Sequence, residues 1–189
     1  MSSTIITAIR GRRVWDSRGR PTVEAEITLA GGASGRAIAP AGASTGSGEA
    51  LDKRDGGAAF GGYDVTGAVD AVNRELAPAV LGMDARAQAA LDARLIARDG
   101  TPQKTRLGAN ATLAVSMAAA HAAAAASGLP LWRYLGGDAP DTLPLPQIQI
   151  LGGGAHAGRR VDIQDFLVMC PAATSHLHLP HPAIARAAS

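Results

Sequence analysis

The order of the predicted elements indicates an α+β fold for residues 1–138: strands come first and helices follow. Two observations predict it. Apolar and polar residues alternate along 22–29, TVEAEITL, which is the period of a half-buried strand. From residue 65 onward the apolar residues instead recur at helical spacing. We therefore expect a three-stranded antiparallel meander with helices packed on one face of the sheet.

The three strands are predicted at residues 4–15, 22–29 and 36–39. The turn DSRGRP separates the first two and contains Gly19 and Pro21, which are typical turn residues. The turn GGASG separates the second strand from the third. Short turns between consecutive strands predict antiparallel neighbours.

Three helices follow the strands. Asp64 is a candidate N-cap for a helix over 65–82, and Asp84 is a candidate cap for a second helix. The third helix is predicted from about Ala109 to Ser127, where Gly128 and Pro130 would end it. The apolar residues of the second helix are Leu91, Leu95 and Ile96.

Composition places the chain among soluble globular proteins, with 47% hydrophobic and 18% charged residues. The formal net charge of +2 requires no nucleic-acid partner. Residues 109–128 are rich in alanine and contain polar residues, so we expect a buried helix and no membrane span. Cys170 is the single cysteine, which excludes an intramolecular disulfide and fits a reducing cytoplasm; the N-terminus shows no secretion signal.

A Gly/Pro-containing boundary near 136–142 separates the α+β domain, 1–138, from a second unit, 139–173. The second unit is predicted as strand, Gly-rich loop, strand. Residues 174–189 change character and contain His176, His178 and His181. A shifted reading frame, a natural disordered tail and a transition-metal site on these histidines are alternatives for this segment.

The stretch from 42 to 56, GASTGSGEALDKRDG, follows the third strand. The hydroxyls of Ser44 and Thr45 could ligate a hard cation or bond a phosphate oxygen. It lacks the Gly-Lys-Ser/Thr ending of a P-loop. The alternative is a hinge with a cap for a helix that starts near Glu49.

Three residues of the second unit are candidates for chemistry. His156 lies in the Gly-rich loop GGGAHAG, where it could handle a proton or a charge, or be solvated. Gln164 and Asp165 are neighbours in VDIQDFLV, so strand alternation predicts opposite faces, and one of them could reach a site. The alternative for this pair is an edge strand that faces solvent.

These segments together resemble the enolase family, the phosphopyruvate hydratases. The stretch RGRRVWDSRGRPTVEAEI is similar to its opening signature, D-S-R-G-x-P-T-V-E, and GASTGSGEALDKRDG is similar to its first mobile loop. DGTPQKTRLGANATLAVSMAAAHAAA resembles the family's D-G-T-x-x-K-x-x-L-G-A-N-A helix, and LPLPQIQILGGGAHAGRRVDIQDFLV its entry to the barrel domain with the second mobile loop. The resemblance is colinear from about residue 5 to residue 173.

The resemblance implies a lyase that removes water from 2-phosphoglycerate with Mg²⁺, using an α+β domain followed by an eightfold barrel of mixed strand direction. That chemistry comes from the known family and not from the residues themselves. It implies that Ser44 ligates a second Mg²⁺, that His156 folds over the substrate near its phosphate, and that Gln164 lines the substrate pocket. Asp165 would help to handle the departing hydroxyl. A homodimer formed largely through the first domain is implied as well.

Two departures from the family pattern concern the second mobile loop. QILGGGAHA replaces N-x-x-N-G-G-[SE]-H-A, so that Gln149, Gly152 and Ala155 stand at its variable points. Asp165 replaces a glutamate and would move the carboxylate by roughly 1.5 Å. Because misplacements near 1 Å can cost about a hundredfold in rate, a related phosphonate or carboxylate substrate is an alternative.

By the resemblance, the proton-abstracting lysine, three carboxylate ligands of the first Mg²⁺ and a phosphate-binding arginine would lie beyond residue 189. We therefore expect an incomplete barrel and no turnover from residues 1–189 alone, since loops cannot run the elimination without those groups. A truncated, non-catalytic relative that serves as a binding or assembly module is the alternative to an enzyme.

Overall fold

A computed structural model describes residues 3–42, 45–138 and 144–172 of the chain. Contacts between residues divide the chain into two units, Met1–Asp138 and Ala139–Ser189. The first unit contains a sheet and seven helical segments among its described residues, and the second contains a hairpin. Each unit is described by itself.

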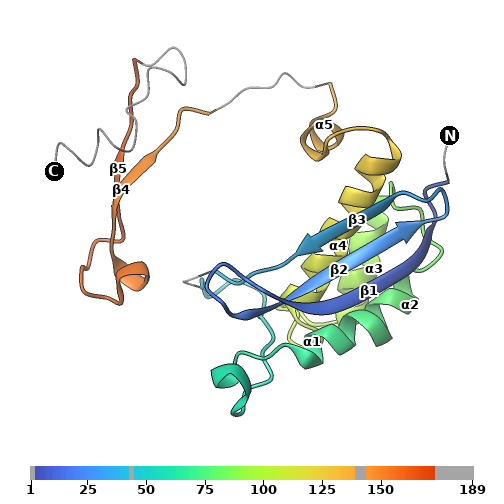
Figure 1. The fold of residues 1–189 in the computed structure, drawn as a ribbon, viewed down its shortest axis with the longest axis horizontal. Helices are drawn as coiled ribbons and strands as arrows, with labels where there is room; N and C mark the ends of the chain where they lie inside the picture. Colours follow the sequence, from blue (N-terminus) through green and yellow to red (C-terminus); the bar gives the residue numbers. More distant parts are fainter. Residues whose placement is uncertain (1–2, 43–44, 139–143, 173–189) are drawn as a thin grey trace. The chain divides into compact units, whose positions relative to one another are not determined.

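The first unit begins with a three-stranded antiparallel sheet in the order β1-β2-β3 (Figure 1). Its strands are β1 (Ile6–Trp15), β2 (Pro21–Leu29) and β3 (Ser34–Ile38). The predicted meander is thus confirmed, with strand ends shifted by one or two residues. In the turn between β1 and β2, the Asp16 carboxylate accepts the backbone N–H groups of Arg18 and Arg20 at 2.8 and 2.9 Å. These bonds close the turn before Pro21 starts the next strand.

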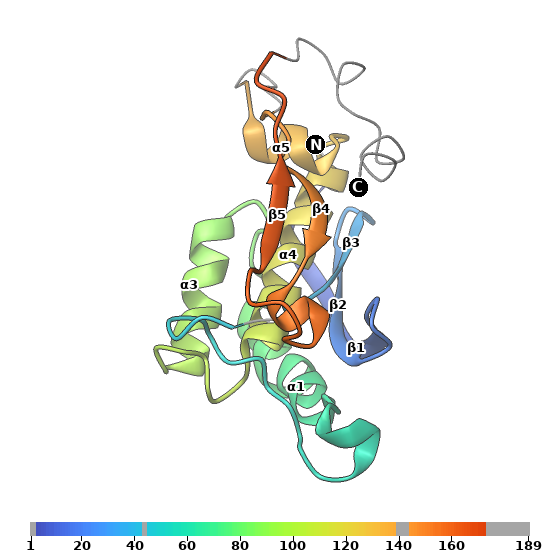
Figure 2. The ribbon, with the colours of Figure 1, turned by 90° about the vertical axis from the view of Figure 1, so that its left-hand side faces the viewer.

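Helices cover one face of this sheet. The longest, α4, packs against β2 and β3, and α3 packs beside α4 (Figures 1 and 2). No helix within the described ranges is long and apolar enough to cross a membrane. The helical segments are η1 (Ala59–Gly62), α1 (Thr66–Ala71), η2 (Val72–Leu76), α2 (Ala77–Val80), α3 (Gln88–Asp99), α4 (Ala109–Ala126) and α5 (Leu131–Gly136).

The contact between β3 and α4 is a backbone contact. A Cβ atom placed on Gly35 of β3 would lie 2.1 Å from the nitrogen of Ala122 and 2.4 Å from the carbonyl oxygen of Ala118. Only glycine fits at this point. The alanine-rich sequence of α4 therefore has a structural reason: small side chains let the helix approach the sheet closely. The prediction of a buried helix here is confirmed, since the α4 residues that face the core are fully buried.

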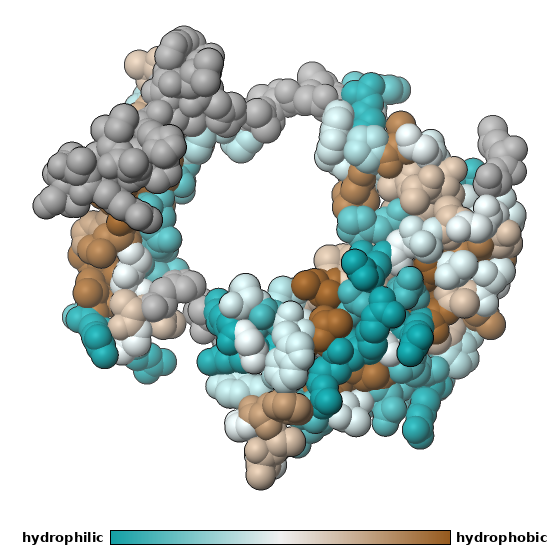
Figure 3. All heavy atoms as spheres, in the orientation of Figure 1, coloured by the Kyte–Doolittle hydropathy of each residue, from teal (hydrophilic) through white to brown (hydrophobic). Residues whose placement is uncertain are grey.

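The apolar side of β2 forms the centre of the core, with Val23, Ala25, Ile27 and Leu29 at most 1% exposed. The alternation predicted for this strand is present, but its polar side is partly buried as well. Glu24 lies between Arg12 of β1 and Arg36 of β3 and pairs with both guanidiniums. Because β2 is the central strand, neighbouring side chains cover its polar face, on which hydrophilic residues gather (Figure 3).

The predicted helix over 65–82 forms as one run of three segments, α1, η2 and α2. Its middle segment has π-helical hydrogen bonds because Pro78 cannot donate to the carbonyl four residues earlier and its ring would clash there. The prediction that Asp64 caps this helix was wrong, because its carboxylate pairs with Arg13 at 2.8 Å. Asp55 takes the role instead and accepts the N–H groups of Thr66 and Gly67 at 2.6 and 3.0 Å.

Asp84 does not cap the second helix either, because α3 starts at Gln88. Its carboxylate accepts the hydroxyl of Thr4 at 2.7 Å and the backbone N–H of Arg86 at 2.9 Å. The Arg86 side chain is the largest cause that lowers the pKa of Asp84 to about 2, followed by the Thr4 hydroxyl. Asp84 therefore ties the start of the chain to the turn before α3.

The described part of the second unit is an antiparallel hairpin of β4 (Ile148–Gly152) and β5 (Asp165–Val168). A short 3-10 helix, η3 (Gly154–Ala157), lies in the loop between the strands. This is the predicted order of strand, Gly-rich loop, strand. The described residues contain the first strands of a barrel and no closed barrel.

We predict that Gly35→Ala lowers the free energy of unfolding by about 3 kcal/mol, because the added methyl group meets the backbone of α4. Urea unfolding followed by far-ultraviolet circular dichroism measures the loss. Gly48→Ala is the matched control, since among the described residues nothing lies within 4 Å of a Cβ at that position. Equal midpoints for the two variants would contradict the close contact.

The lowered pKa of Asp84 predicts a pH-dependent contribution to stability. Because the folded pKa lies below the ordinary value of 3.8, the contribution is present above about pH 4 and is lost as the pH falls toward 2. Asp84→Asn should cost about 1 kcal/mol at pH 7, discounted because the pair is partly exposed, and almost nothing near pH 2. Urea titrations at both pH values test this, with the exposed Asp70→Asn as control; a loss that is independent of pH contradicts it.

Candidate functional site

Candidate functional residues occur in each of the two units, and each group is described by itself. The first group lies in the loop that follows β3, which contains the stretch similar to the first mobile loop. Its described part, from Thr45 onward, forms a turn and then an extended segment, so the helix considered near Glu49 does not form. The Glu49 carboxylate folds back and accepts the N–H of Gly46 at 2.8 Å. Ser44, the predicted metal ligand, lies outside the described residues.

A second motif, residues 99–110, holds this loop in place. The N–H of Leu51 donates to the carbonyl of Gln103, and the N–H of Ala109 donates to the carbonyl of Leu51, both at 2.7 Å. The Gln103 side chain donates to the carbonyl of Ser47 at 3.0 Å. The loop is therefore fixed on both sides by a segment about fifty residues later in the chain.

Asn110 makes the most specific of these contacts. Its amide oxygen accepts the N–H of Lys53 at 3.3 Å, and its amide nitrogen donates to the carbonyl of Lys53 at 3.0 Å. Gly108 makes room for this pairing: it has a φ of +100°, and a Cβ there would lie 2.6 Å from the Cβ of Lys53. Asn110 is 3% exposed, so its buried side-chain amide satisfies both the backbone N–H and the backbone carbonyl of Lys53.

Asp99 organises the segment that carries these contacts. It is 2% exposed, and its carboxylate accepts the N–H groups of Thr101 at 3.0 Å and Leu107 at 2.7 Å, as well as the Thr101 hydroxyl. Burial alone would raise its pKa, but these hydrogen bonds outweigh burial and lower it. Asp99 is thus held as a buried anion that closes the loop before α4.

A cavity of about 350 Å³ lies at the base of the first loop. Thr45, Glu49 and Asp52 line it from the loop, and Asn110 and Met117 line it from α4. Its size suits a small ligand, and its lining combines polar and apolar groups. Residues of both family-like motifs line it.

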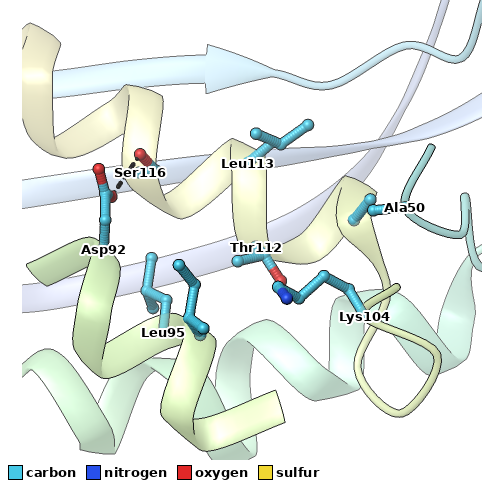
Figure 4. Close-up of a pocket in the computed structure, with 9 residues that line it drawn as sticks. Ala50, Asp92, Leu95, Lys104, Thr112, Leu113 and Ser116 are labelled. Atoms are coloured by element: carbon cyan, nitrogen blue, oxygen red, sulfur yellow. Dashed lines mark hydrogen bonds between the residues drawn. The ribbon is translucent and has the colours of Figure 1, made fainter. Parts of the chain in front are cut away.

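A second cavity, of about 290 Å³, lies between α3 and α4 (Figure 4). Leu95 and Leu113 supply hydrocarbon to its wall, and Lys104 extends from the loop toward the helix. At one end the Ser116 hydroxyl donates to the carboxylate of Asp92 at 2.7 Å. None of the predicted site residues lines this cavity.

The second group of candidate residues lies in the hairpin β4–β5, where the side chains of Gln164 and Asp165 are hydrogen-bonded. The amide groups of Gln149 and Gln164 both donate to the Asp165 carboxylate, the latter at 3.2 Å. The prediction that Gln164 and Asp165 point to opposite faces was therefore wrong, because Gln164 precedes the strand and alternation does not apply to it. Gly152, the register partner of Asp165, leaves room for the Gln149 amide, 3.1 Å from an added Cβ.

His156 belongs to η3 in the same hairpin, and its side chain lies outside the described part of the structure. His176, His178 and His181 lie outside it as well. Within the described ranges, no three His, Cys, Asp or Glu residues gather closely enough to hold a metal ion. Both oxygens of Asp165 accept hydrogen bonds from amides.

Sequence reasoning missed Asn110, Asp99 and Gln149. Asn110 and Asp99 belong to motifs that resemble the family. The partner of Asn110 is distant in the sequence, and the partners of Asp99 lie in a turn, where residues show no hydrophobic periodicity. Gln149 was noted only as a departure from a pattern. An asparagine inside an otherwise apolar helix start is the one local signal that could have indicated a buried backbone contact.

Comparison with known proteins assigns both units. Residues 6–135 match the family described as enolase, N-terminal domain, and residues 140–178 match that described as enolase, C-terminal TIM barrel domain. The chain is 57% identical over 164 residues to an enolase from Acidothermus cellulolyticus and 56% identical over 164 residues to enolase 1 from Desulfitobacterium hafniense. Each match covers 87% of this chain and 38% of the relative.

The chain therefore belongs to the enolase family. It spans 38% of the length of these two relatives.

We predict that Asn110→Ala speeds hydrogen exchange of the Lys53 amide at least about tenfold, because a partner worth 1–2 kcal/mol is removed. Asn73→Ala is a matched control: Asn73 bridges the N–H and carbonyl of Gly11 in the same two-way manner, at 2.8 and 3.1 Å. Each variant should speed exchange at its own partner only. Exchange at Lys53 that responds equally to both variants would contradict the local anchor.

Proposed function

We propose that this chain contributes the first domain and the second mobile loop of an enolase-type lyase, which removes water from 2-phosphoglycerate to give phosphoenolpyruvate with Mg²⁺. One observation carries the proposal. Two motifs that resemble the family's first mobile loop and its helix D-G-T…G-A-N-A lock together through Asn110 and Lys53. That contact anchors the loop that follows β3, and the matches to both enolase domains support its assignment.

In this proposal Ser44 ligates the second Mg²⁺, with the remaining metal ligands supplied by residues outside the described set. His156 approaches the phosphate of the substrate, and Gln164 lines the pocket. Asp165 handles the hydroxyl that leaves C3 as water after C2 has lost its proton. The amides of Gln149 and Gln164 orient the Asp165 carboxylate by donating to it.

Asp165, in place of the family's longer glutamate, favours a second candidate function: a lyase with an altered substrate preference. Gln149 reaches the Asp165 carboxylate from the neighbouring strand, across from Gly152. Asp165 is one methylene shorter than a glutamate, and a shift of this size at a reacting group can change the rate and the preferred substrate. A related phosphonate or carboxylate is therefore the alternative substrate class, and a non-catalytic binding or assembly module remains the alternative role.

We also propose a cytoplasmic homodimer that pairs through the first unit. An exposed aromatic surface supports it: Trp15 is 55% and Phe60 44% exposed, and their rings meet edge to face at 5.1 Å. Arg13 lies over Phe60 and Arg20 over Tyr63, at 4.8 and 4.3 Å from the ring centres. Aromatic and arginine side chains of this kind are enriched where proteins bind one another.

The test joins residues 1–172 to the remaining part of the Acidothermus cellulolyticus enolase and follows enol formation from 2-phosphoglycerate. We expect Mg²⁺-dependent turnover from this fusion and none from residues 1–189 alone. Ser44→Ala should raise the Mg²⁺ requirement, and Asp165→Glu should change kcat about tenfold or more, because the carboxylate moves by roughly 1.5 Å. A folded fusion without turnover, or one indifferent to Ser44→Ala, would contradict the proposal; turnover by residues 1–189 would contradict the expected inactivity of that segment.

A further inference from the structure

A groove on the first unit shares no lining residue with the two cavities described above. It has a volume of about 380 Å³ and runs between the neighbouring helices α2 and α3. Its floor is small and apolar, formed by Pro78, Ala79 and Ala97. Its polar groups are Glu75, Arg94 and Arg98. Because the apolar lining residues are small, a ligand in the groove can reach the charged side chains.

One end of the groove already holds a carboxylate between guanidinium groups. The Glu75 carboxylate accepts a hydrogen bond from Arg106 at 2.7 Å and forms an ion pair with Arg98 at 3.1 Å. The hydrogen bond from Arg106 is the largest cause that lowers the pKa of Glu75. Two guanidinium groups at this end thus contact one carboxylate oxygen, Oε2 of Glu75.

The other end of the groove carries a cation without such a partner. Arg94 precedes Arg98 by one helical turn on α3, is exposed, and forms no ion pair with any residue that the structure describes. Among the described residues that line the groove, Arg94 and Arg98 are the basic ones and Glu75 is the acidic one; Glu75 pairs with Arg98 and with Arg106, which lies outside the lining. The groove keeps an excess of positive charge at the Arg94 end.

We propose that this groove binds a small ligand with a pyrophosphate group, which bridges Arg94 and Arg98. Side chains four residues apart on a helix have Cβ atoms about 5–6 Å apart, a span that suits two adjacent phosphoryl groups. A pyrophosphate carries more negative charge and more acceptor oxygens than an orthophosphate, so it should engage the two guanidiniums more strongly. The apolar floor accepts the uncharged remainder of the ligand, and the volume is within the usual range for small-molecule sites. This site goes beyond the proposed lyase function and does not depend on it.

The experiment titrates the ¹⁵N-labelled chain 1–189 with inorganic pyrophosphate at low ionic strength and follows the backbone resonances of α2 and α3. Arg94→Gln should weaken binding about tenfold, as expected for a lost charge-assisted bond. Glu75→Gln should strengthen binding several-fold, because it removes the competing carboxylate. Arg74→Gln is the matched control: Arg74 is an exposed arginine on η2, paired with Asp70 at 3.6 Å and outside the groove.

Arg94 is the primary site of substitution because it has no ion pair to lose among the described residues, so the variant should fold; thermal unfolding checks this. Arg94→Lys should give an intermediate affinity, since it keeps the charge and loses the planar fork. Orthophosphate should bind several-fold more weakly than pyrophosphate. Equal weakening by Arg74→Gln and Arg94→Gln, equal affinity for the two anions, or no resonance change in α2 and α3 would each overturn the proposal.

Discussion

The backbone contact between Gly35 of β3 and the α4 segment at Ala118 and Ala122 is the constraint on which the rest of the first unit depends. A helix that lies this close to a sheet must present small side chains, and α4 does so along its buried face. The apolar face of β2 is thereby shielded, and its apolar residues form the centre of the core. Dense packing of this kind leaves little freedom for α4 to shift, so its N-terminal end is a fixed point in the unit.

That fixed point positions the candidate site. Asn110, in the first turn of α4, holds both backbone groups of Lys53, and Ala109 holds Leu51. Asp99 closes the preceding loop from inside the protein. The loop after β3 is therefore anchored by rigid structure at its far end, while the cavity at its base remains open. A site built in this way takes its geometry from a helix and a sheet, and its chemistry from the residues that the loop carries.

Period and composition were sufficient to predict the meander and the buried alanine-rich helix, because both are local patterns. The helix caps were not predictable in the same way. Asp64 and Asp84 precede helices, and aspartate is a common N-cap residue. In the structure, however, Asp64 pairs with an arginine and Asp84 bonds to a threonine. Asp55, eleven residues before the start of α1, caps that helix instead. The pairing of Asn110 with Lys53 depends on the tertiary fold. The Ser44 hydroxyl and the loop position of His156 indicated possible chemistry locally, but the specific roles proposed for them came from resemblance to a family.

The central claim is that α4 and the sheet form one rigid core to which the loop after β3 is anchored. Native-state hydrogen exchange of the chain tests it most directly. The account predicts that the amides of Ile27 and Ala118 exchange slowest and only on global unfolding, and that the amides of Leu51 and Lys53 are protected at an intermediate level. Exchange at Leu51 and Lys53 as fast as at Gly48, in the exposed turn, would contradict the account.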